Sequence, residues 1–196
     1  MALLIGIARW IGIINASALT LGRWLGAICI ALMVVFILAQ VFFRYVVGNA
    51  LAWPEEASRF LMLWSAGLMI GTAYRRGGLV AIEVLTAMLP RLLRHVLALA
   101  LLAMSLVILW KGLQIGLKEV TGISGRFGTD SLNYPVNWTL SEWKKVPKSW
   151  QMTSMVVGLV ALIAVNLELM LREFIGLIGG EKRLPEIADQ VQMGAE

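Results

Sequence analysis

The feature that most limits how this chain can fold is a run of uncharged, largely apolar residues at 24–43, with Arg23 before it and Arg44 after it. A helix of about 20 such residues is long enough to cross the hydrocarbon core of a bilayer. Apolar residues make up 59% of the 196-residue chain and charged residues 15%, whereas soluble domains average about 45–50% and about 25%. A soluble domain of this length could not bury so much apolar surface. The sequence therefore predicts an integral membrane protein.

Three further segments have the length and composition of membrane spans. They are residues 54–74, 96–117 and 150–171. The second begins at Pro54, where the missing N–H of proline removes no helical hydrogen bond. The third includes Lys111, whose long side chain can reach the headgroups. We therefore expect an all-α membrane protein, in which residues 23–175 form one domain of four spanning helices with short interfacial helices beside it.

The two ends of the chain lie outside these spans. Residues 1–22 are mostly apolar but contain Arg9, which would cost about 2.5–3.5 kcal/mol at the bilayer centre. We therefore expect an N-terminal interfacial helix that runs into the first span, in preference to a fifth span. A signal peptide is disfavoured because Arg9 interrupts its apolar part. Residues 176–196 are predicted to form a polar tail without a further span.

Two connectors between the spans carry recognisable signals. Arg75 and Arg76 precede two glycines, a pattern that predicts a helix end and a basic cytoplasmic anchor, followed by a short interfacial helix over 79–89. Residues 118–149 form a long loop, in which the capping-box pattern from Thr139 to Glu142 predicts a short amphipathic helix on the membrane surface. Four tryptophans are expected to be interfacial anchors: Trp24, Trp110, Trp143 and Trp150.

The connector between spans two and three indicates how the chain is oriented in the membrane. Basic residues are divided almost equally between the two sides, so their total does not decide the orientation. The compact cluster formed by Arg75, Arg76, Arg91 and Arg94 favours a cytoplasmic connector. Both termini are then cytoplasmic, and the loop at 118–149 is periplasmic.

The residues needed for several kinds of chemistry are scarce. Cys29 and His95 are the only cysteine and histidine, which excludes an intrachain disulfide, a cysteine metal cluster and multi-histidine haem or zinc sites. The middle of every expected span lacks charge, whereas proteins that move ions by themselves usually have ionisable groups or broken helices there. We therefore expect no catalytic, metal or cofactor site. The basic residues flank apolar runs, which is typical of membrane anchoring and gives no reason to expect a nucleic-acid partner.

Four pairs of glycines are spaced by four residues, a pattern that lets membrane helices approach closely. They are Gly22 with Gly26, Gly67 with Gly71, Gly112 with Gly116, and Gly176 with Gly180. We expect them to serve packing within the chain more than contact with a partner.

The densest polar cluster lies between the first two spans. Its members are Arg44, Asn49, Trp53, Glu55, Glu56 and Arg59. One interpretation is helix capping at the positive helix end together with a local ion pair between Glu55 and Arg59, four residues apart. The other is a polar latch that fixes the hairpin of spans one and two and docks a partner.

The order and spacing of these residues also carry a family resemblance. Arg44-Tyr45, Gly48-Asn49, Trp53-x-Glu55-Glu56-x-x-Arg59 and Arg75-Arg76-Gly77-Gly78 together resemble the DctQ-type small membrane subunit of tripartite ATP-independent periplasmic (TRAP) transporters. The resemblance is strongest over residues 40–90. The sequence departs from the family pattern at Leu79, Ala81 and Glu83, where the family often has a histidine, a basic residue and an aspartate.

The resemblance implies a four-helix subunit of the bacterial inner membrane, with both termini cytoplasmic. It also implies a larger multi-span subunit, which carries the substrate and sodium sites, and a soluble periplasmic protein that delivers an organic acid anion. Because the sequence ends in a polar tail, we expect the large subunit to be a separate chain. The loop at 118–149 would either touch the binding protein or shield the large subunit.

The function expected from these observations is a non-catalytic scaffold in a sodium-coupled importer, with the large subunit, the binding protein and membrane lipids as partners. Two alternatives from other classes are a stand-alone four-helix membrane enzyme or cofactor carrier, and a self-assembling channel. The transported molecule and the dimerisation of the complex cannot be read from this chain.

Overall fold

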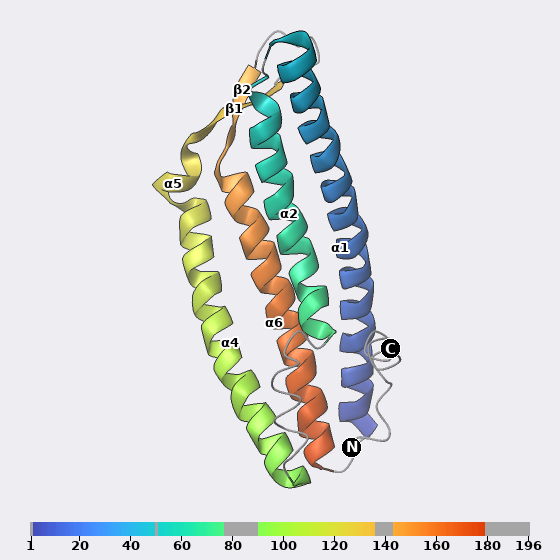
Figure 1. The fold of residues 1–196 in the computed structure, drawn as a ribbon. Helices are drawn as coiled ribbons and strands as arrows, with labels where there is room; N and C mark the ends of the chain where they lie inside the picture. The colour runs from blue at the N-terminus through green and yellow to red at the C-terminus, as the bar shows by residue number, and fades with distance from the viewer. Residues whose placement is uncertain (1, 50, 77–89, 136–142, 179–196) are drawn as a thin grey trace. The chain divides into compact units, whose positions relative to one another are not determined.

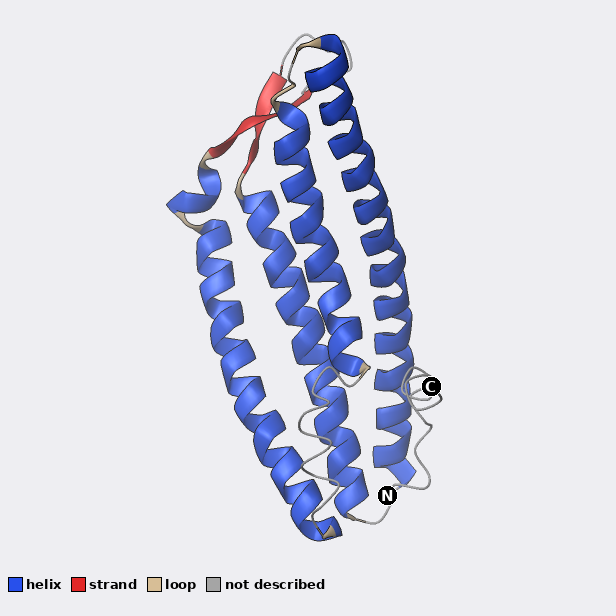
Figure 2. Cartoon of the chain, viewed as in Figure 1, coloured by secondary structure: helices blue, strands red, loops and turns tan. Residues whose placement is uncertain are grey.

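A computed structural model describes residues 2–49, 51–76, 90–135 and 143–178. Most of them belong to four long helices, labelled in Figure 1: α1 (Ala2–Phe42), α2 (Trp53–Arg75), α4 (Arg91–Thr121) and α6 (Ser149–Leu177). The shorter elements are a π-helical turn η1 (Phe43–Val47), a small helix α5 (Ile123–Arg126) and the strands β1 (Gly128–Pro135) and β2 (Trp143–Pro147). Figure 2 shows the two strands in red among helices.

The chain forms two compact units, and each takes segments from all four long helices. The first unit consists of Met1–Leu21, Ile70–Gly112 and Leu159–Glu196. The second unit consists of Gly22–Met69 and Leu113–Gly158, and it includes the two strands.

The buried side chains of both units are mostly small or polar, whereas many large apolar side chains point outward. Val165 and Ile175 are buried, but Leu38, Val107 and Ile108 are 62–66% exposed. Water-soluble proteins show the opposite distribution, because water drives large apolar side chains inward. In lipid that driving force is absent, and small residues let helices approach closely. The distribution therefore fits a chain surrounded by lipid.

Close helix packing in the second unit depends on glycines. A Cβ atom added at Gly22 on α1 would lie 2.8 Å from the carbonyl oxygen of Leu68 on α2. A Cβ atom at Gly67 on α2 would collide with the backbone carbonyl of Ser154 on α6. The expectation that these glycines pack within the chain is confirmed for both positions.

The turn between α1 and α2 depends on one glycine. Gly48 has a φ of 73°, a left-handed conformation that favours glycine, and it ends the π-helical turn. The backbone N–H groups of Gly48 and Asn49 both donate to the carbonyl oxygen of Phe43. These two hydrogen bonds give the carbonyl oxygen of Phe43 its partners at the end of the helix, just before α2 begins.

Each predicted span lies wholly or almost wholly within a long helix. Among the described residues, three helical stretches are long and apolar enough to cross a membrane by length and composition: Leu4–Val47, Leu92–Thr121 and Ser149–Leu177. The remaining long helix, α2, is not one of them. The fourth span therefore stays a prediction.

The helices at the two ends of the chain compare differently with the expected ones. Helix α1 is continuous from Ala2, as expected of a helix that runs into the first span. The interfacial position of residues 1–22 stays a prediction. Helix α6 continues to Leu177, six residues beyond the predicted end at 171. The short helix expected over 79–89 and residues 179–196 of the predicted tail lie outside the described residues.

The prediction of an amphipathic helix after Thr139 is wrong for the residues that the structure describes, which begin at Trp143. Trp143 to Val146 belong to strand β2, which pairs antiparallel with β1 through Asn133 opposite Lys145 and Tyr134 opposite Lys144. A capping-box pattern is a local signal, and pairing with a distant segment overrides weak local propensity. Burial of Val146 at 7% exposure fixes which side of the strand faces inward.

Candidate functional site

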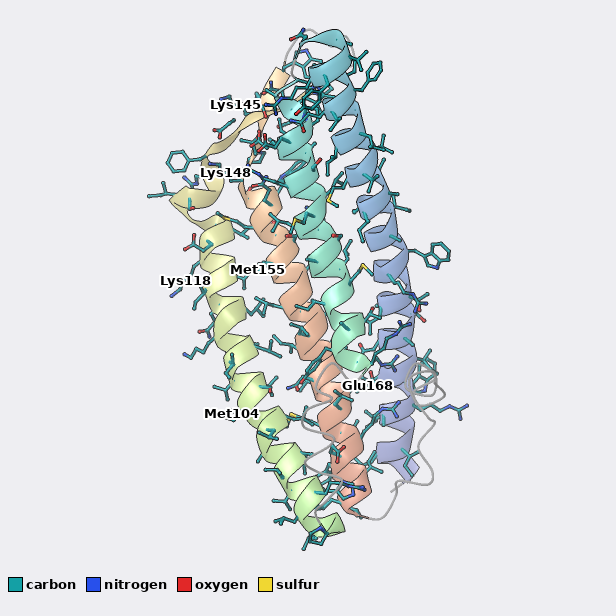
Figure 3. The ribbon with its side chains drawn as sticks, viewed as in Figure 1. Met104, Lys118, Lys145, Lys148, Met155 and Glu168 are labelled. Atoms are coloured by element: carbon teal, nitrogen blue, oxygen red, sulfur yellow. The ribbon has the colours of Figure 1, made fainter. Side chains whose placement is uncertain are left out.

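The strongest polar contacts of the first unit meet at Glu168 on α6, which is labelled in Figure 3. Glu168 is 0% exposed. Arg75 on α2 donates from Nη2 to Oε1 at 2.7 Å and from Nε to Oε2 at 3.2 Å. Asn15 on α1 donates from Nδ2 to Oε2 at 2.9 Å. Arg172 donates from Nε to Oε1 at 3.2 Å. Three helices therefore meet at one carboxylate.

These donors occupy the acceptor capacity of Glu168. An ionised carboxylate offers about four lone-pair sites, and each oxygen of Glu168 accepts two hydrogen bonds. The paired bonds from Arg75 have the fork geometry in which guanidinium and carboxylate bind most strongly. A carboxylate held in this way is suited to joining helices and has no free site for an ion in this arrangement.

The backbone of α1 is adapted to this cluster at Gly12. Its carbonyl oxygen accepts a hydrogen bond from Arg75 Nη2 at 3.1 Å. A Cβ atom at Gly12 would lie 3.2 Å from Glu168 Oε1 and 3.3 Å from Arg172 Nη2. A side chain there would crowd the cluster, so glycine lets α1 approach the charged groups.

Two smaller contacts join the remaining helix of the first unit. Tyr74 on α2 donates to Asn166 Oδ1 at 2.7 Å, and Asn166 Nδ2 donates to the carbonyl oxygen of Leu102 on α4 at 3.0 Å. His95 Nδ1 on α4 lies 2.7 Å from Glu173 Oε2 on α6. Helices α2, α4 and α6 are therefore joined by side-chain hydrogen bonds.

In the second unit, Glu56 in the first turn of α2 holds the strand β1. Its Oε2 atom accepts hydrogen bonds from the backbone N–H of Ser131 at 2.6 Å, the N–H of Leu132 at 3.1 Å and the hydroxyl of Ser131 at 2.6 Å. Its Oε1 atom accepts the N–H of Asp130 at 3.0 Å. One carboxylate thus satisfies three consecutive backbone donors of the strand.

The six residues predicted to form a latch make separate contacts. Glu55 and Arg59 form an ion pair at 2.6 Å with side chains 61% and 72% exposed. Glu56 binds β1 and Trp53 packs edge-on against Phe36, with ring centroids 5.4 Å apart. Arg44 lies over the ring of its neighbour Tyr45, and Asn49 contributes its backbone N–H to the turn. Contact of these residues with a partner stays a prediction.

Arg75 and Arg76, predicted to form a basic cytoplasmic anchor, lie at the C-terminal end of α2. Arg75 is 7% exposed, and its guanidinium is directed to Glu168, which lies 93 positions later in the chain. Removal of one partner from such a buried pair would leave the other charge uncompensated. Arg76 is partly buried. The position of both residues relative to the headgroups stays a prediction.

The four tryptophans expected to be interfacial anchors are all exposed, between 50% and 67%. They are Trp24, Trp110, Trp143 and Trp150. Their position in the headgroup region stays a prediction.

Sequence reasoning missed the residues that matter most in the first unit. Glu168 is the only acidic residue in the predicted span 150–171, and Arg172 follows it by four positions. An ionisable residue in an apolar helix indicates a partner in the interior, so Glu168 could have been paired with a basic residue of another helix. Among the described residues, no group of three or more His, Cys, Asp or Glu could hold a metal ion.

Comparison with known proteins gives one match. Residues 33–176 match the family model for the DctQ component of tripartite ATP-independent periplasmic transporters. No curated protein and no solved structure matches the chain. The matched segment includes α2, α4, the strands, the C-terminal end of α1 from residue 33 on, and all of α6 except Leu177. Because it covers well over half of the sequence, the chain belongs to the DctQ family, the non-catalytic membrane subunits of TRAP transporters.

Proposed function

We propose that this chain is the scaffold subunit of a sodium-coupled TRAP transporter that imports an organic acid anion across the bacterial inner membrane. The observation that carries the proposal is the state of Glu168. Its carboxylate is buried and fully used by donors of the same chain. A subunit built in this way stabilises its own helices and leaves ion and substrate binding to another chain.

The partner in the membrane is a larger multi-span subunit, encoded as a separate chain, that carries the sodium and substrate sites. The outward apolar side chains of the long helices support this assignment, since such faces suit both lipid and a second membrane protein. The small subunit widens the footprint of the large one and gives its moving part a fixed frame. A soluble periplasmic protein delivers the substrate.

The orientation is part of the same proposal. Both termini lie in the cytoplasm, and the segment 118–149, which contains β1 and β2, faces the periplasm. The basic connector after α2 supports this orientation. Fusion of a reporter that is active only in the periplasm tests it. Activity is expected when the reporter is inserted after Gly128, and activity at the C-terminus would contradict the orientation.

A pull-down from the host's own membranes tests the central assignment. The chain carries a C-terminal tag, the membranes are solubilised in mild detergent, and co-purified proteins are identified by mass spectrometry. We expect a much larger multi-span protein in stoichiometric amount. Recovery of the chain alone, or only with copies of itself, would contradict the scaffold role and favour a self-assembling channel.

The latch is tested by the double substitution Glu56→Ala with Arg59→Ala. We expect the double variant to insert into the membrane normally but to retain less of the large subunit, because Glu56 holds β1 near the start of α2. Arg59→Ala alone is the control, since the pair with Glu55 is exposed. Normal co-purification of the double variant would refute the latch.

A further inference from the structure

The first unit contains an apolar groove between α4 and α6 with a volume of about 370 Å³. It is lined by Leu106, Val107, Trp110, Lys111, Ile163 and Leu167. Val107 and Leu167 are 63% and 48% exposed, so the groove opens to the outside of the helices. Its volume lies within the range of small-molecule sites, about 300–1,000 Å³.

Lys111 gives the groove one charged end. It is exposed, and no acidic side chain among the described residues forms an ion pair with it. From Lys111 to Leu106 the wall extends five residues along α4, about 7.5 Å of helix axis, and it carries no other charge. A cation within an apolar membrane helix that has no acidic partner among the described residues indicates a ligand or a partner of opposite charge.

The ligand that fits this arrangement is an amphiphile with an anionic head and an apolar tail. We propose that the groove binds one anionic phospholipid, with Lys111 contacting the phosphate and an acyl chain lying along Leu106 and Val107. Trp110 stands beside Lys111 with 54% exposure, and indole rings are favoured where headgroups meet acyl chains. This inference rests on the membrane location of α4 and α6 and not on the scaffold role.

The two ends of the groove contribute differently. An acyl chain gains little by leaving bulk lipid for an apolar groove, because both surroundings are equally apolar. The wall therefore sets the shape of the site, whereas Lys111 sets its preference for a negative headgroup. A phospholipid with net negative charge is expected to bind better than a zwitterionic one of the same acyl chains.

Native mass spectrometry of the purified full chain tests the proposal. The chain is delipidated in detergent and titrated with dioleoyl phosphatidylglycerol or with dioleoyl phosphatidylcholine as the zwitterionic comparison. We expect one phosphatidylglycerol to remain bound at collision energies that remove phosphatidylcholine. Lys111→Ala should weaken this retention about fivefold, the effect of losing one lysine–headgroup contact. Val107→Trp should abolish it by filling the groove.

Matched variants separate the groove from general effects. Lys118→Ala removes another exposed lysine of α4 that does not line the groove, and Met104→Trp places the same bulk at an exposed position outside it, labelled in Figure 3. Both should retain phosphatidylglycerol as the wild type does, and all four variants should melt within a few degrees of it.

Three results would overturn the proposal. The first is equal retention of the two lipids, and the second is unchanged retention in Lys111→Ala or Val107→Trp. The third concerns the assembled complex: crosslinking of a photoreactive residue at Val107 to another protein, without a co-purified anionic lipid, would identify the groove as a protein interface.

Discussion

Glu168 in the first unit and Glu56 in the second each accept four hydrogen bonds, but from different kinds of donor. Glu168 is fully buried and receives two guanidinium groups and an amide from three helices. Glu56 is partly exposed and receives three backbone N–H groups and a hydroxyl from one strand. Neutral donors suffice where solvent can reach the carboxylate, whereas a charge removed from solvent requires a counter-charge.

The two carboxylates also stabilise parts of the molecule that differ in size. The contacts of Glu168 join α1, α2 and α6, so their loss affects the packing of a whole unit. The contacts of Glu56 join the start of α2 to β1, so their loss affects one local element. Substitutions at the two carboxylates should therefore differ in both size and extent.

The largest effect is expected for Glu168→Ala. It leaves the buried Arg75 and the partly buried Arg172 without the carboxylate that they share, and removal of one partner from a buried ion pair costs about 3–5 kcal/mol. Thermal unfolding of the purified chain in detergent should show a markedly lower midpoint than the wild type. A midpoint equal to that of Glu56→Ala would break the distinction between the two carboxylates.

A smaller and local effect is expected for Glu56→Ala. The backbone N–H groups of Asp130, Ser131 and Leu132 lose their acceptor, and an unsatisfied polar group costs about 1–3 kcal/mol when it is buried. Because solvent reaches this site, we expect the lower end of that range. Hydrogen exchange should accelerate at these three amides and stay unchanged around Glu168. Unchanged protection of β1 would show that other contacts hold the strand.

Gly12→Ala tests the packing around Glu168 without removing a charge. The added methyl group would lie 3.2–3.3 Å from Glu168 Oε1 and Arg172 Nη2, so these groups must shift slightly. Mild overpacking should lower the stability by about 1 kcal/mol, the low end for crowded interiors. Gly6→Ala, on the same helix with no atom within 4 Å of the added methyl group, is the control: it gains the same helix propensity without crowding, so its midpoint should equal or exceed that of the wild type. Equal midpoints for the two variants would mean that α1 adapts freely at Gly12.

The smallest effect is expected for Glu55→Ala. The side chains of Glu55 and Arg59 are both exposed, and exposed ion pairs contribute about 0–1 kcal/mol to the stability of a protein. The unfolding midpoint and the exchange of the hairpin amides should match the wild type. A loss as large as that of Glu56→Ala would show that the exposed pair supports the hairpin, contrary to its geometry.

The sequence was informative where a signal is local and less so where a partner is distant. Charged residues mark both ends of α2, and its predicted range of 54–74 differs from Trp53–Arg75 by one residue at each end. The sequence predicts a cytoplasmic anchor at Arg75 because it ends a helix, whereas its pairing with the distant Glu168 appears only in the fold. The same limit applies to Trp143–Pro147, whose strand forms only because β1 lies beside it.

The candidate site was predicted in part. The cluster at 44–59 is conspicuous because its charged and polar residues lie close together in the sequence, and it includes Glu56. The residues that contact or surround Glu168 are Gly12, Asn15, Arg75 and Arg172. All of them except Arg172 are far from Glu168 in the sequence. Pairing these residues requires knowing which helices lie side by side.

We infer that Glu168 stabilises the subunit and takes no part in ion coupling. The most direct test reconstitutes the complete transporter with Glu168→Gln, and measures both the unfolding midpoint and substrate uptake per assembled complex. The double variant Arg75→Gln with Glu168→Gln removes both partners of the pair. We expect a lower midpoint for Glu168→Gln, partial recovery in the double variant, and wild-type uptake by every complex that assembles. A normal midpoint combined with lost uptake would contradict it and place this carboxylate in the transport cycle.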